Sequence, residues 1–184
     1  MKNLAATKIQ KTRQTNLVKP HDGLTLLSTD QATILAMFTE YEREKTRTTI
    51  AAKGKVALRI CHLLEIHAMI EEEIFYPAAK RVLGKKTETL LTELRSKLDV
   101  IKGLIEKLKH LPAKDRMFDS MVRVLGDTTA QHFKEEEAKL FPSVRHSNID
   151  LAGMGERLAA RQLELATVSP DKKVFREGRR VLSG

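Results

Sequence analysis

The 184-residue chain has little of several residue types, and each shortage excludes something. It contains one cysteine, Cys61, no tryptophan and only 4% aromatic residues. A single cysteine cannot form an internal disulfide and fits a reducing compartment. No apolar run is long enough to cross a bilayer, and the first residues do not form the apolar segment of a secretory signal. We therefore expect a cytoplasmic protein without a membrane anchor.

Strand signals are also missing, because apolar residues do not alternate with polar ones between turns. Leu, Ala, Glu, Lys and Arg dominate, with 41% apolar and 31% charged residues. Apolar residues recur at helical spacing over about residues 24–46, 49–75, 87–110, 115–141 and 151–168. The pattern predicts an all-α fold: an up-down-up-down four-helix bundle of residues 22–168 with a short extra C-terminal helix.

The positive charge is concentrated at the two ends of the chain. Residues 1–20 carry a charge of +5 and residues 170–184 carry +3, which leaves +1 of the net +9 for the bundle. We interpret residues 1–21 as a flexible basic arm and residues 169–184 as a basic tail. Basic ends can touch nucleic acid, but no recognition motif accompanies the charge, so nucleic acid is not the expected partner.

One pattern occurs twice in the chain. His67 is followed by Glu71, Glu72 and Pro77, and His132 is followed at the same spacing by Glu136, Glu137 and Pro142. A histidine and a glutamate four residues apart share one helix face, where they can offer a nitrogen and a carboxylate to one metal ion. The periodicity also directs Gln31 inward. The prolines are expected to bend or end their helices.

Other reactive side chains receive structural interpretations. Tyr41 and Tyr76 are interpreted as packing residues with a polar tip rather than redox relays. The glutamates beside the motifs are interpreted as solvated helix faces.

The chain resembles the hemerythrin-like proteins with the HHE cation-binding domain over about residues 22–168. The resemblance is carried by four segments: Leu26–Gln31, His67–Pro77, Val100–Ile105 and His132–Pro142. It implies a four-helix bundle around a non-haem di-iron site. It also implies oxygen binding, oxygen or redox sensing, or iron handling, with dioxygen or a small redox molecule as ligand. The motif positions carried over as metal ligands are His67, Glu71, His132 and Glu136.

Two positions depart from the family pattern. Gln31 stands where the family usually has a histidine in its first helix, and Leu98 stands where it usually has a histidine in its third helix. An amide oxygen is a weak ligand for a hard metal and a hydrocarbon is none. The expected set is therefore His67, Glu71, His132 and Glu136, with Gln31 as a weak fifth ligand or as a buried amide bonded to one of the histidines.

Three hypotheses remain open. The chain binds iron, as a pair or a single ion, or less readily manganese or zinc, and acts in oxygen, redox or iron handling. Alternatively, the four groups neutralise one another without metal, and the bundle is a degenerate interaction or scaffold module for an unknown protein partner. A di-metal oxidase or peroxidase is the third, although no sequence feature defines a substrate pocket.

Overall fold

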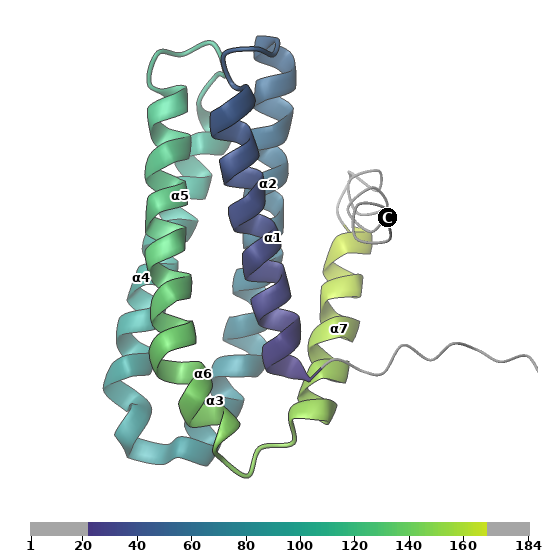
Figure 1. Cartoon of the computed structure of the whole chain (residues 1–184), viewed down its shortest axis with the longest axis vertical. Coiled ribbons are helices and arrows are strands. Elements are labelled where there is room, and N and C mark those ends of the chain that lie inside the picture. Colours follow the sequence, from purple (N-terminus) through teal and green to yellow (C-terminus); the bar gives the residue numbers. More distant parts are fainter. Residues whose placement is uncertain (1–21, 169–184) are drawn as a thin grey trace, which may run out of the picture.

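The computed structural model describes residues 22–168, and the predicted basic arm and tail lie outside this range. The helical elements form four columns and a fifth, outer helix. The columns stand side by side in alternating directions, and the outer helix lies against them (Figure 1). In the described range, all regular structure is helical. The predicted all-α bundle with an extra C-terminal helix is therefore confirmed.

The first column is α1 (Gly23–Glu44), and the second contains α2 (Ile50–Ile70), η1 (Glu71–Phe75) and α3 (Tyr76–Leu83). A short 3-10 turn, η2 (Gly84–Thr87), leads to the third column, α4 (Glu88–His110). The fourth contains α5 (Phe118–Glu135), η3 (Glu136–Leu140) and α6 (Phe141–Arg145). The outer helix is α7 (Leu151–Val168).

Local chemistry fixes several helix ends. Asp22 caps α1 by accepting a 2.9 Å hydrogen bond from the backbone N–H of Thr25. Thr49 caps α2 in the same manner through Ala52. Such caps satisfy backbone donors that have no partner inside the helix. Gly84 ends α3 with a φ of 62°. A residue with a side chain would be strained in this conformation.

The second and fourth columns each contain a π-helical segment directly after the His-x-x-x part of the motif. In η1 it begins at Glu71, and in η3 it begins at the equivalent Glu136. Of the two expected outcomes, a bend or an end, the end does not occur, because both columns continue past Pro77 and Pro142 in α3 and α6. Each proline stands in the first turn of its α-helix, where its missing N–H and fixed φ are tolerated.

The core is a continuous apolar layer between the four columns. Leu27, Leu94, Leu125 and Phe133, from three different columns, are each at most 2% exposed. Met154 and Leu158 of α7 are fully buried against the bundle, so α7 is part of the folded unit. Within residues 22–168, no helix combines the length and apolarity that a membrane span requires.

Candidate metal centre

The centre of the bundle contains a polar cluster within the apolar core. Gln31, His67, Glu71, His132 and Glu136 are each at most 2% exposed. Gln31 comes from α1, His67 and Glu71 from the second column, and His132 and Glu136 from the fourth. The structure thus brings together all five residues that the sequence predicted as ligands, while Leu98 of α4 is buried as a core side chain.

Glu71 lies between the two imidazoles. Its Oε1 is 2.9 Å from His67 Nε2, and its Oε2 is 3.7 Å from His132 Nε2. His132 Nε2 is also 3.7 Å from Glu136 Oε2. Nitrogen and oxygen atoms of His67, Glu71 and Glu136 all lie within 4.8 Å of one another, a spread that suits one cation.

Several cluster atoms are buried without a hydrogen bond. His67 Nε2 and Glu71 Oε1 are close, yet their geometry does not make one. Among the described residues, the cluster atoms without a hydrogen-bond partner are Gln31 Oε1, His67 Nδ1 and Nε2, both Glu71 oxygens and His132 Nδ1. Buried polar groups are nearly always satisfied, and an ion is one of the ways to satisfy such a group. The donor set of imidazoles and carboxylates fits a transition-metal cation.

Glu136 is held by two donors from other columns. Gln31 Nε2 donates to its Oε2 at 2.8 Å, and the Tyr76 hydroxyl donates to its Oε1 at 2.5 Å. The buried amide of Gln31 therefore binds a carboxylate, and not a histidine as one expectation had it. Tyr76 is fully buried and contacts the cluster, which the interpretation of it as a packing residue missed. The signal that could have found it is its position one residue before Pro77, just after the ligand motif.

In the metal-free cluster, burial and the neighbouring charges shift the pKa values of His67, Glu71 and Glu136. Burial alone would lower the pKa of His67, but the carboxylates of Glu71 and Asp30 outweigh it and raise the pKa to about 10. Burial opposes ionisation of Glu71 as well, yet the two imidazoles hold its pKa at about 2. Burial, followed by the charge of Glu71, raises the pKa of Glu136 well above its ordinary value. Without a cation, the cluster therefore retains protons on His67 and Glu136.

The glutamates beside the ligand motifs lie outside the cluster, and three of them make ion pairs. Glu72 pairs with Lys102 at 2.6 Å, and Glu73 pairs with Arg161 at 2.7 Å. Glu135 pairs with Lys97, while Glu137 is exposed. Each motif thus sends one glutamate inward and its neighbours toward solvent or a surface cation.

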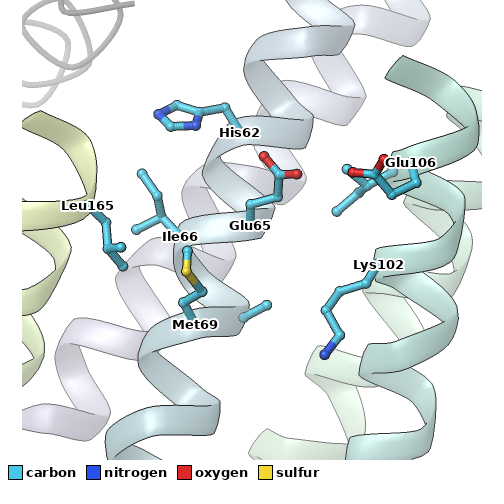
Figure 2. Close-up of a pocket in the computed structure, with 9 residues that line it drawn as sticks. His62, Glu65, Ile66, Met69, Lys102, Glu106 and Leu165 are labelled. Carbon is cyan, nitrogen blue, oxygen red and sulfur yellow. The ribbon is translucent and has the colours of Figure 1, made fainter. Parts of the chain in front are cut away.

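A separate groove lies on the outer face of α2. Figure 2 shows Ile66 and Met69 of α2 between Leu165 of α7 on one side and Lys102 and Glu106 of α4 on the other. The groove encloses about 560 Å³. Its lining shares no residue with the buried cluster. Ile66 precedes His67 in the chain, so groove and cluster lie on different faces of α2.

Comparison with known proteins agrees with this geometry. The model of the hemerythrin HHE cation binding domain matches residues 22–144, about two thirds of the chain. The chain belongs to the hemerythrin HHE cation-binding family. The resemblance seen in the sequence is confirmed, and cation binding is the property by which this family is described. The matched residues contain all five cluster members, whereas α7 lies beyond them.

Two individual proteins are similar to parts of this hemerythrin-like chain. A crystal structure of a hemerythrin HHE cation binding domain-containing protein from Mycobacterium kansasii aligns with a TM-score of 0.64. It is 17% identical and the alignment covers 79% of this chain and 87% of that one, which supports the fold alone. A protein named DNA nickase from Nostoc sp. is 31% identical over 84 residues. That match covers 46% of this chain and only 23% of the nickase.

Proposed function

We propose that residues 22–168 form a divergent hemerythrin that binds iron in the bundle centre and acts in oxygen, redox or iron handling. The proposed ligands are His67, Glu71, His132 and Glu136, with the Gln31 oxygen as a weak fifth. The observation that carries the proposal is that ligand atoms of His67, Glu71 and Glu136 lie within 4.8 Å of one another, while His67 Nε2 and both Glu71 oxygens have no hydrogen-bond partner.

The charges of the cluster support a cation. The buried carboxyl groups of Glu71 and Glu136 lie close to the imidazoles, and Glu136 accepts hydrogen bonds from Gln31 and Tyr76 that suit its ionised form. A divalent cation would replace the protons on His67 and Glu136 and neutralise both carboxylates. A metal-free scaffold module would give no role to the buried cluster atoms that lack a hydrogen-bond partner, and this distinguishes it from the proposed metal site.

The residues suit a single ion better than a pair. The fourth column supplies His132 and Glu136, and the second supplies His67 and Glu71, but α4 contributes a hydrocarbon at Leu98. Iron, when bound, supplies one-electron chemistry and an open position for a small ligand such as dioxygen. The chain holds the carboxylates in place through Tyr76 and Gln31, and excludes bulk water by burying every ligand.

Two further features belong to the proposal. The buried thiol of Cys61, whose pKa burial raises to about 12, fits a cytoplasmic protein in which no disulfide is needed.

The groove on α2 shares no lining residue with the cluster, so small diffusible ligands suit the site better than a large substrate.

Metal analysis after growth with excess iron and, separately, with excess manganese tests this proposal. We expect iron to co-purify and to give a visible absorption band in air that changes when the protein is reduced under argon. A colourless protein that retains manganese or zinc in both preparations would contradict the assignment of iron. A protein with under about 0.1 equivalent of any transition metal would overturn the metal site itself.

A further inference from the structure

Two consecutive residues of the outer helix α7 contact residues next to the candidate metal centre. Gln162 Nε2 donates to Asp30 Oδ2 at 2.5 Å, and the Arg161 guanidinium binds both oxygens of Glu73 at 2.7 and 3.1 Å. Asp30 adjoins Gln31 in α1, and Glu73 lies in η1 two residues after Glu71. The helix therefore contacts the first and second columns next to the cluster, although it lies beyond the residues that match the family.

Beyond Asp30 lies His67 Nδ1, a cluster atom that has no hydrogen-bond partner. The Asp30 oxygen that accepts from Gln162 lies 3.9 Å from His67 Nδ1, while His67 Nε2 lies 2.9 Å from Glu71 Oε1. The two ring nitrogens of His67 thus face two different carboxylates. A small recess of about 30 Å³ is lined by Asp30 and Gln162, so their side chains meet at the inner edge of the α7 interface.

We infer that Gln162 is a positioning residue for the metal centre: it holds the Asp30 carboxylate opposite His67 Nδ1 and thereby turns His67 Nε2 toward the cation. A ligating histidine commonly donates its second N–H to a carboxylate, which fixes the ring orientation. The inference rests on the proposed function in so far as Nε2 is a ligand atom. It extends the site to α7.

The neutral amide of Gln162 suits this role. Asp30 has a quarter of its side chain exposed, and it could rotate toward solvent if no donor held it. The amide N–H of Gln162 supplies that donor and so restrains the Asp30 carboxylate. Arg161 provides a contrast, because its ion pair with Glu73 fastens α7 to the bundle but does not reach Asp30.

Three variants separate positioning from simple attachment of α7. Gln162→Leu keeps the size but removes the donor, Gln162→Lys keeps a donor, and Arg161→Leu loosens α7 without touching Asp30. The first readout is zinc affinity by competition with a chromophoric chelator, since zinc binds such sites tightly. We expect Gln162→Leu to bind zinc about tenfold more weakly and the other two variants to stay within about twofold of the unaltered chain.

The second readout needs no metal. In chelator-treated protein, NMR should show a slowly exchanging Nδ1 proton on His67 in the unaltered chain, Gln162→Lys and Arg161→Leu, but not in Gln162→Leu. Equal effects of Gln162→Leu and Arg161→Leu on both readouts would reduce Gln162 to a packing contact and overturn the inference. If the unaltered chain binds no zinc, the proposed metal site fails, and the ring proton alone then decides whether Gln162 positions His67.

Discussion

The Tyr76 hydroxyl donates a 2.5 Å hydrogen bond to Glu136 and so joins the two copies of the repeated motif. Tyr76 follows His67 by nine residues, and the residue nine after His132 is Phe141, which has no hydroxyl. The repeat is therefore asymmetric at this position. One copy supplies the donor and the other supplies the carboxylate that accepts it.

Tyr76→Phe should destabilise the metal-free protein by about 1–2 kcal/mol, since it removes the hydroxyl that donates to the buried carboxyl group of Glu136. Urea unfolding monitored by circular dichroism measures the loss. Tyr41→Phe is the matched control, because Tyr41 donates to Asp119, whose side chain is 38% exposed, away from the cluster. Equal effects of both changes on stability and on metal affinity would mean that the hydrogen bond from Tyr76 to Glu136 contributes no more than the one from Tyr41 to Asp119.

The sequence predicted the fold and the cluster for physical reasons. Spacing of four residues places His67 with Glu71, and His132 with Glu136, on the inner faces of their helices, and all four are buried as expected. Gln31 was placed inward by the same periodicity. Such patterns are local, and burial of one helix face is enough to produce them.

Three features could not be predicted in the same way. The π-helical segments insert an extra residue into one turn, so Phe75 and Tyr76 are buried where a regular α-helix would have buried Ile74. Tyr76 thereby reaches Glu136. The contact between Gln162 and Asp30 joins residues 132 positions apart and depends on how α7 packs, which no local pattern records.

The carboxylates should be required for metal binding in a position-specific manner. We expect Glu71→Gln to weaken zinc or iron binding by more than about tenfold, because a neutral amide replaces the carboxylate between the two histidines. Glu72→Gln is the control, since Glu72 pairs with Lys102 at the surface. Competition titration measures both. A Glu71→Gln protein with unchanged affinity would remove Glu71 from the ligand set.

Restoring the two missing imidazoles should increase the metal capacity. We expect the double variant Gln31→His, Leu98→His to bind more iron per chain than the unaltered protein, since the resemblance in sequence implies a family histidine at each of these positions. Leu94→His is the control, because Leu94 is fully buried in the same helix one turn earlier. It should lower stability without adding metal. If the double variant binds no more iron than Leu94→His, the alignment of Leu98 is wrong.

Stability of the metal-free protein should fall as the pH rises. His67 has a folded pKa near 10 against 6.5 ordinarily, so its stabilisation is complete below pH 6.5 and is lost through pH 10. The pKa of Glu136 is raised, so its ionisation adds to the decline above its ordinary value of 4.5. Glu71 affects stability in acid. Its ionised carboxylate stabilises the folded protein fully above pH 4.5, and this contribution is lost as the pH falls through about 2.

Urea unfolding with a chelator at pH 5, 7 and 9 measures this trend. The background is His67→Leu, Glu71→Leu, which removes the coupled charges and leaves the surface unchanged. The unaltered chain should lose more stability between pH 5 and pH 9 than this background does. Saturating zinc should reverse the trend, since metal binding releases the same protons. Parallel profiles for the two chains would contradict the assigned pKa shifts.

The central claim is that His67, Glu71, His132 and Glu136 hold a cation rather than only one another. Its most direct test is an anaerobic titration of chelator-stripped protein with ferrous iron, followed by calorimetry and by metal analysis after desalting. The account predicts saturation near one ion per chain for the unaltered protein and loss of that binding in Glu71→Gln. Retention of under about 0.1 ion per chain by the unaltered protein, or equal binding by both proteins, would contradict it.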